Sequence, residues 1–205
     1  FAHTIPGYQG KCAAWLDVPL QDGKEKFLKP GYERRAEAIA IAKEVKRIAD
    51  SCGSTLSIGV ISFYRAQCDL ILDAFVDQGL AEEEDGEIRI ARSYRQTESG
   101  DERLRVGTVD AFQGKEFDVV FLSIVRANDV VVSDQKEGDE RERLLNGKYG
   151  HLRLANRLNV AMSRQRKLLV AVGDQRMAEG PESEEGVPAL TAFLKLCREE
   201  MAHGR

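Results

Sequence analysis

The sequence has few cysteines and histidines and no apolar run long enough to cross a membrane. Among its 205 residues are only four cysteines and three histidines. The cysteines are widely scattered, with no CxxC pair and no histidine at a zinc spacing, which favours free thiols in a reducing compartment. No apolar run approaches the roughly 20 residues that span a bilayer, and the opening FAHTIPGYQG lacks the regions of a secretory signal. We therefore expect a cytoplasmic protein with no metal site.

Phosphate-binding loops are missing as well. A P-loop has four residues between its first glycine and a Gly-Lys pair, followed by Ser or Thr that reaches magnesium. The nearest candidate starts at Gly107, but six residues precede Gly114-Lys115, and Glu116 takes the place of the hydroxyl. No GxGxxG is present either. If the protein works on ATP, we expect another domain to supply the phosphate cradle.

The composition is that of an ordinary globular protein, but the charged residues are unevenly distributed along the chain. Hydrophobic residues make up 42% and charged residues 31%, and the formal net charge is −4. A chain of this length buries roughly 70% of its surface without any staple, so one domain is expected. Acidic residues gather at 82–85, 129–142 and 182–185, whereas residues 151–167 hold four arginines, one lysine and no acid. The one basic segment is the natural place for an anionic ligand.

Strand-like and helix-like segments alternate along the chain. Apolar runs predict strands, and apolar residues spaced by three and four predict helices. The predicted strands cover residues 13–18, 56–62, 88–91, 104–109, 118–125 and 168–172, and the predicted helices cover residues 33–50, 66–75, 152–164 and 188–201. This order indicates an α/β fold with a doubly wound, mainly parallel sheet, and such folds bind ligands at the carboxyl ends of their strands. Residues 129–148 show neither period, and we expect a mobile insertion there.

The predicted helix 152–164 combines an apolar stripe with a row of arginines. Leu154, Ala155, Leu158, Ala161 and Met162 fall at helical offsets and should be buried. Arg153, Arg157 and Arg164 are spaced by four and seven residues, which places them along one side. Guanidinium forks suit anionic oxygens. The alternative is a solvated face whose arginines pair with neighbouring acids.

Three segments together resemble motifs of the superfamily 1 helicases, particularly the 1B branch that includes the nonsense-mediated-decay helicase. Residues 58–67 (IGVISFYRAQ) resemble motif IV, residues 106–116 (VGTVDAFQGKE) resemble motif V, and residues 157–166 (RLNVAMSRQR) resemble motif VI. The resemblance implies that residues 1–205 form the C-terminal RecA-like domain, the second of two motor domains that close around ATP. It also implies that ATP and Mg²⁺ are held mainly by the N-terminal lobe, which carries the P-loop and is absent from these residues.

The resemblance also assigns roles to individual residues. Arg164 would be the arginine finger, which acts on the γ-phosphate during hydrolysis. Gln113, Gly114 and Glu116 would lie at the nucleotide, with Glu116 accepting hydrogen bonds from the ribose. Single-stranded nucleic acid would contact Ser62, Phe63, Tyr64, Gln67, Thr108 and Asp110. Phe63 stands where the family commonly has proline, and Gln165 replaces a small residue between the motif VI arginines.

Each assignment has a purely structural alternative. Arg164 could cap the C-terminus of its helix. Glu116 could be a surface acid paired with Lys115 or Arg126, and Tyr64 could be a buried residue at a strand end. For the whole chain, the leading hypothesis is a motor lobe that is inactive without its N-terminal partner. The competing hypothesis is a degenerate helicase lobe that serves as a nucleic-acid- or protein-binding scaffold.

Overall fold

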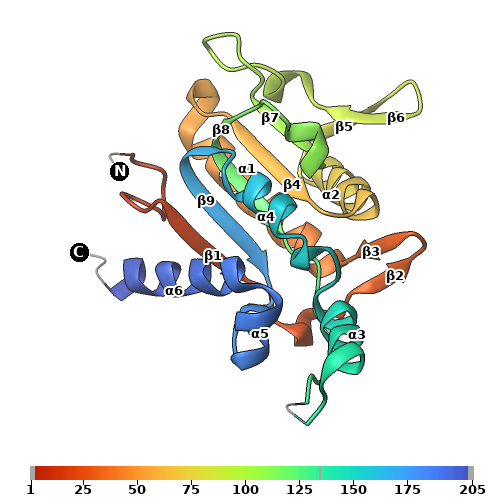
Figure 1. Ribbon diagram of the computed structural model, residues 1–205. Coiled ribbons are helices and arrows are strands. Elements are labelled where there is room, and N and C mark those ends of the chain that lie inside the picture. The colour runs from red at the N-terminus through yellow and green to blue at the C-terminus, as the bar shows by residue number, and fades with distance from the viewer. Residues whose placement is uncertain (1–2, 134, 203–205) are drawn as a thin grey trace.

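The core of the molecule is a parallel sheet of five strands in the order β1-β9-β8-β4-β7 (Figure 1). The computed structural model describes residues 3–133 and 135–202. All neighbouring strands of this sheet run parallel. The strands are β1 (Ala13–Asp17), β4 (Ile58–Ser62), β7 (Leu104–Thr108), β8 (Phe117–Ser123) and β9 (Gln165–Gly173). Every residue of β4 is buried, as expected of a strand covered on both faces.

Helices cover both faces of the sheet. On one face, α1 (Arg35–Cys52) and α2 (Arg65–Asp77) pack over strand residues such as Val119 and Phe121. On the other face, α3 (Gly138–Tyr149), α4 (Ala155–Met162), and α6 (Pro188–Ala202) pack over the alternate positions Val120 and Leu122, with α5 (Pro181–Gly186) beside them. Successive strand residues point to opposite faces, so each strand contributes to both cores. The predicted doubly wound α/β fold is confirmed.

Two small antiparallel hairpins lie outside the main sheet. One consists of β2 (Lys26–Leu28) and β3 (Gly31–Glu33), and the other of β5 (Ala81–Glu84) and β6 (Glu87–Ile90). The predicted strand at residues 88–91 therefore exists, but it pairs locally instead of joining the parallel sheet. Strand β2 has only three residues, and β5 is mostly acidic, so neither shows the apolar pattern on which strand prediction depends.

The region predicted to be an insertion contains α3, which begins at Gly138. Only Leu145 and Tyr149 of this helix are buried, so its sequence has little apolar periodicity. Asp139 and Glu140 lie in its first turn, where negative charge stabilises the positive end of the helix dipole.

The predicted helix 152–164 is shorter than expected. A 3₁₀ turn, η5 (Gly150–Arg153), precedes α4, and the helix ends at Met162. Leu158 and Ala161 are buried as predicted, but Leu154 is 45% exposed because it precedes the helix instead of lying on its inner face. Arg164 consequently lies in the turn between α4 and β9, outside any helix.

Candidate functional site

The loop that precedes β8 is exposed, and buried aromatic rings fix both of its ends. The chain leaves β7 through a 3₁₀ turn, η4 (Val109–Phe112), and Gln113, Gly114 and Glu116 follow, all exposed. The buried rings of Phe112 and Phe117 lie 5.4 Å apart, centroid to centroid. Gly114 has a φ of +74°, which favours glycine, and nothing lies within 4 Å of where its Cβ would be. A ligand therefore has open access to this backbone.

Two glycines explain how this connection crosses the sheet. It passes from the carboxyl end of β7 to the amino end of β8, and β4 lies between those strands. A Cβ on Gly59 would come within 2.7 Å of the Phe112 ring, and a Cβ on Gly107 within 3.0 Å of the Ala111 side chain. Because neither glycine has a side chain, the connection can lie flat against the strands.

Arg164 reaches the same edge of the sheet. The Phe117 backbone N–H donates to the Arg164 carbonyl at 2.9 Å, which brings the starts of β8 and β9 together. The Arg164 side chain is half-buried, and its Nε donates to the Val160 carbonyl at 3.0 Å, as a residue that caps a helix C-terminus would. No described carboxylate pairs with this guanidinium, and no described residue accepts a hydrogen bond from its terminal nitrogens.

Glu116 pairs with Arg166 instead of with the partners considered from sequence. The distance from the Arg166 Nε to the Glu116 Oε2 is 3.4 Å, and both side chains are more than half exposed. Lys115 pairs with Glu102 at 2.6 Å, and Arg126 is buried against another acid. An exposed pair of this kind contributes little stability, so Glu116 can exchange its partner at small cost.

The nucleotide candidates therefore gather at the amino ends of β8 and β9. The fold class predicts ligands at the carboxyl ends of the strands, whereas these candidate residues lie at the opposite edge. The reason is the connection after β7, which returns across the sheet before β8 begins.

At the carboxyl end of β4, the predicted nucleic-acid contacts are buried. The exposed fractions are 0% for Ser62, 5% for Phe63, 3% for Tyr64 and 0% for Gln67. The Gln67 side chain accepts from the Arg34 backbone N–H at 2.7 Å and donates to the Arg34 carbonyl at 3.3 Å. These four side chains are thus occupied inside the protein, and direct contact between them and a nucleic acid is not available in this structure.

Tyr64 takes the buried alternative that the sequence left open. Its ring stacks on His151 with centroids 4.9 Å apart and meets Tyr32 edge-on at 5.5 Å. Its hydroxyl accepts from the His151 backbone N–H at 3.2 Å. A base could not reach a ring that is covered on both sides.

Of the two remaining nucleic-acid candidates, Asp110 is exposed and Thr108 is half-buried at the end of β7. The Asp110 carboxylate pairs with Arg157 of α4, so the segments that resemble motifs V and VI are in direct contact. Arg153 pairs with Glu142 of α3 at 2.8 Å. For these two arginines the solvated-face alternative describes the structure, whereas Arg164 pairs with no acid among the described residues.

Sequence reasoning missed a buried polar cluster at the carboxyl end of β8. Glu37 of α1 is fully buried, accepts from the Ser123 hydroxyl at 2.5 Å and the Val125 N–H at 2.9 Å, and lies 3.5 Å from Arg34. Burial raises the Glu37 pKa to about 7, although the serine, the arginine and the backbone N–H lower it. The position of Glu37, four residues before buried Ile41, was the available signal.

The backbone turn at Val125 is hydrogen-bonded to this cluster. Its φ is +65°, which is unfavourable for a β-branched residue. The Arg126 N–H donates to the Ile124 carbonyl at 2.6 Å, which closes a tight turn around Val125. The hydrogen bond from Val125 to Glu37 therefore stabilises a strained turn.

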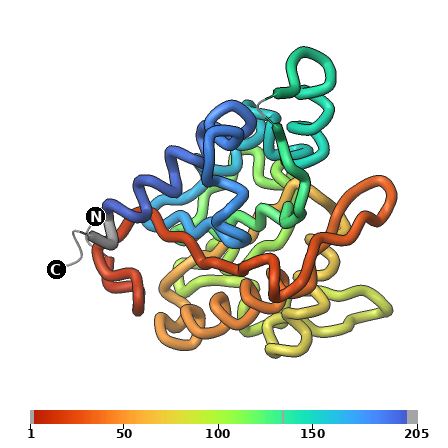
Figure 2. Tube along the Cα trace, turned by 90° about the horizontal axis from the view of Figure 1, so that it is seen from below, coloured from red at the N-terminus to blue at the C-terminus, as the bar shows by residue number. Residues whose placement is uncertain are grey.

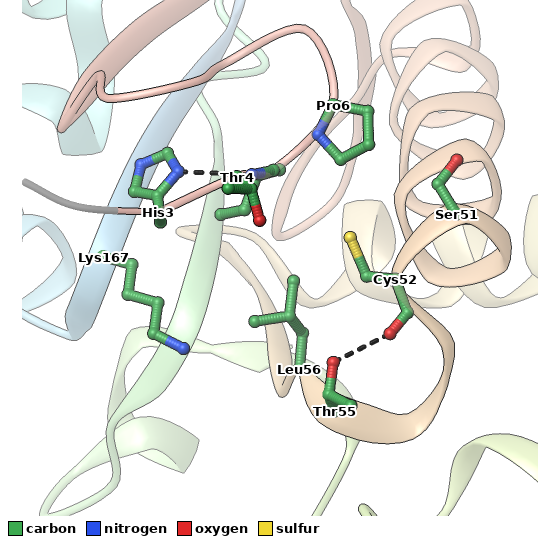
Figure 3. A pocket seen from close by; sticks show the side chains of 9 residues that line it. His3, Thr4, Pro6, Ser51, Cys52, Thr55, Leu56 and Lys167 are labelled. Carbon is green, nitrogen blue, oxygen red and sulfur yellow. Dashed lines mark hydrogen bonds between the residues drawn. The ribbon is translucent and has the colours of Figure 1, made fainter.

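A hollow of about 470 Å³ lies between the N-terminal segment and the end of α1 (Figure 3). Several of its polar side chains already have partners. The Thr55 hydroxyl donates to the Cys52 carbonyl at 2.8 Å, and the Lys167 Nζ lies 3.1 Å from Asp118. This hollow therefore offers a ligand little specific recognition.

No described helix is long and apolar enough to cross a membrane. Within residues 3–133 and 135–202, no three acidic, histidine or cysteine side chains are grouped so that they could hold a metal ion.

Comparison with known proteins gives a family match over most of the chain. The family model described as "AAA domain" matches residues 4–176. "Regulator of nonsense transcripts 1 homolog" of Neurospora crassa is 31% identical over 157 residues, which cover 76% of this chain and 12% of that protein. "DNA polymerase alpha-associated DNA helicase A" of Saccharomyces cerevisiae is 32% identical over 164 residues, covering 78% of this chain and 19% of that protein.

A solved C-terminal domain of a possible DNA helicase from Lactobacillus plantarum WCFS1 aligns with a TM-score of 0.44 and 17% identity, covering 91% of this chain and 87% of that chain. This chain spans between 12% and 19% of the length of the two relatives named above.

Proposed function

This chain belongs to the AAA domain family, and from that premise we propose that it is the C-terminal motor lobe of an ATP-dependent DNA or RNA helicase or translocase. The observation that carries the proposal is that the segments holding Glu116 and Arg164 pair at one edge of the sheet: the Phe117 N–H donates to the Arg164 carbonyl, and Glu116 pairs with Arg166. Arg164 offers a guanidinium without a described acidic partner, and Glu116 offers a carboxylate in an exchangeable surface pair. These are the two groups that a nucleotide bound against this edge would need from a second lobe.

The residues present fit the outer wall of a nucleotide site but not its centre. Gln113 and the Gly114 backbone are exposed and can approach a nucleotide, and Glu116 can accept from ribose hydroxyls. A carboxylate would repel a triphosphate, so the ribose is its suitable target. The sequence has no P-loop, and we therefore assign the binding of ATP and Mg²⁺ to an N-terminal lobe.

In this proposal Arg164 is the arginine finger. Hydrolysis of ATP spreads negative charge over the γ-phosphate oxygens in the transition state, and the planar guanidinium stabilises that charge. A hydrogen bond from Nε to a helix carbonyl holds the side chain in place while its terminal nitrogens stay available. The chain alone would be inactive because the finger would have no phosphate to act on.

Nucleic acid would contact the other edge, at the exposed turn that follows β7. Thr108 ends β7 and Asp110 belongs to the turn, and the pair between Asp110 and Arg157 connects the turn to α4, which leads to Arg164. Closure of the two lobes around ATP would then move this turn and the finger together, relative to the N-terminal lobe. Such a cycle requires ATP to bind the closed arrangement better than the open one.

The test compares the isolated chain with the complete helicase that carries it. The 205-residue chain should show no ATP turnover. In the complete protein, Arg164→Ala should reduce kcat by about 10³- to 10⁵-fold while ATP still binds. Arg153→Ala, which removes a surface ion pair, is the matched control and should leave kcat unchanged.

Two results would contradict the proposal. Steady-state hydrolysis by the isolated chain would refute a site split between two lobes. Full activity of the Arg164→Ala protein would leave only the scaffold hypothesis.

A further inference from the structure

The β2–β3 hairpin presents apolar side chains to solvent. Phe27 is 58% exposed and Leu28 is 37% exposed, although both belong to a regular strand. The hairpin projects from the body of the molecule in two perpendicular views, on the side away from α6 (Figures 1 and 2). Adjacent exposed apolar side chains on a projecting element are typical of a binding surface.

The base of this hairpin is fixed to the end of β8. Glu25, immediately before β2, forms an ion pair with Arg126 at 2.7 Å, and both side chains are at least nine-tenths buried. The Glu25 carboxylate also accepts from the Ala127 N–H at 2.6 Å and from the Asn128 side chain at 3.1 Å. From the other strand, the Tyr32 ring lies 4.2 Å from the Arg126 guanidinium carbon. The projection is therefore anchored at its base, and its tip is held in a defined position.

The exposed charges next to the aromatic ring are positive. The sequence from Lys24 to Pro30 is KEKFLKP, and its one acid is the buried Glu25. Lys26 is 70% exposed and its nearest acid, Glu33, is 4.0 Å away. Lys29 forms no ion pair with any residue that the structure describes. Lys24 is also exposed and pairs with Asp129.

The hairpin also lies at the edge of the sheet where the proposed track runs. It follows the carboxyl end of β1 and is tied to the carboxyl end of β8, and Tyr32 packs against Tyr64 at the carboxyl end of β4. In a parallel sheet these ends share one edge with Thr108 at the end of β7. An extended ligand along this edge could therefore contact both Thr108 and the hairpin.

We propose that the tip of this hairpin, Lys26 to Lys29, binds single-stranded nucleic acid. Phe27 stacks on a base, and Lys26 and Lys29 contact phosphates on either side. A flat apolar ring between lysines matches a polyanion that carries exposed planar bases, and stacking on every base alike suits a protein that moves along any sequence. This inference rests on the proposed function, which requires a nucleic-acid track, and it adds a contact that none of the helicase-like motifs contains.

The experiment measures binding of fluorescein-labelled oligo(dT) and oligo(U) to the 205-residue chain by fluorescence anisotropy over a salt series. Phe27→Ala should weaken binding by about 5- to 150-fold, the usual loss for one stacked base. Phe27→Trp should keep wild-type affinity or exceed it, because its ring is larger. Lys26→Ala with Lys29→Ala should lower the slope of log K against log salt by about 1.4, about 0.7 for each lost phosphate contact.

The control variant changes another exposed apolar residue, on the other side of the molecule. Leu196 of α6 is 42% exposed, and Leu196→Ala should bind as the wild type does. All of these side chains are exposed, so each variant should fold, and an unchanged unfolding midpoint establishes that it has. Iodouridine photocrosslinking followed by mass spectrometry should place a crosslink on Phe27.

The two proposals fail in different ways. Wild-type affinity of the Phe27→Ala chain would overturn the role of the hairpin and leave the motor assignment intact. Equal losses for Phe27→Ala and Leu196→Ala would also overturn it, because the effect would not be local. If the wild-type chain binds neither oligonucleotide at low salt, the nucleic-acid part of the proposed function falls together with the hairpin.

Discussion

Replacing Glu37 with glutamine should remove a pH-dependent loss of stability from this fold. The carboxyl group is fully buried between α1 and the end of β8, where it accepts from Ser123 and Val125. Loss of solvation raises its pKa to about 7, and the nearby Arg34 and the hydrogen bonds offset only part of that rise. Glutamine keeps the size of the side chain and one acceptor oxygen but cannot ionise.

The sign and size follow from the difference between the folded and the unfolded pKa. Unfolded, the carboxyl group of Glu37 titrates near its ordinary value of 4.5, whereas in the fold it titrates near 7. Between these values the folded state holds more protons than the unfolded state, so stability falls as pH rises through this range and levels off above it. At about 1.4 kcal/mol for each pKa unit, the full loss is about 3 kcal/mol.

Denaturation by urea at several pH values measures this difference. The chain has one tryptophan, Trp15 on β1, whose indole N–H donates to the Gly173 carbonyl at 2.9 Å, so its fluorescence reports unfolding of the sheet. The free energy of unfolding of Glu37→Gln minus that of the wild type should increase by about 3 kcal/mol from below pH 5 to above pH 7. Other titrating groups are the same in both proteins and cancel. A difference that stays constant with pH would refute the argument that desolvation dominates at Glu37.

Two further predictions concern packing and buried charge. Gly59→Ala should destabilise the protein by about 1–3 kcal/mol, because the new methyl group would meet the Phe112 ring. The control is Gly147→Ala in α3, where no atom lies within 4 Å of the added methyl group. It should be neutral or stabilising in the same urea titration. Arg126→Met should lower the free energy of unfolding by about 3–5 kcal/mol, because it leaves the buried Glu25 carboxylate without its partner. Adding Glu25→Gln should recover part of that loss. An unchanged unfolding midpoint in the single variant would show that the pair contributes nothing to stability.

The sequence predicted the sheet where its strands are buried on both faces. Strands β4, β8 and β9 each contain a nearly continuous apolar run, and these runs identified them. The hairpin strands β2 and β5 are too short to show a pattern; β2 has three residues, and β5 is mostly acidic. The helix α3 escaped detection for a related reason, since only two of its side chains reach the core.

For the candidate site, the sequence identified the segments but not the state of their side chains. The resemblance to helicases is supported by the family match and by helicase relatives. The motif alone could not show that Tyr64 and Gln67 face inward, or that Arg157 is paired with an acid while Arg164 is not. Exposure and pairing depend on neighbours that are distant in sequence.

The order of residues by itself determined the α/β class, the main strands and the segments that resemble helicase motifs, because these follow from local periodicity and from short runs of residues. Only the tertiary structure decided that the segments holding Glu116 and Arg164 lie together at the amino ends of the strands, that Glu37 is buried with a raised pKa, and that an anchored hairpin exposes Phe27. Each of these depends on contacts between elements up to about a hundred residues apart, and no local pattern encodes such contacts.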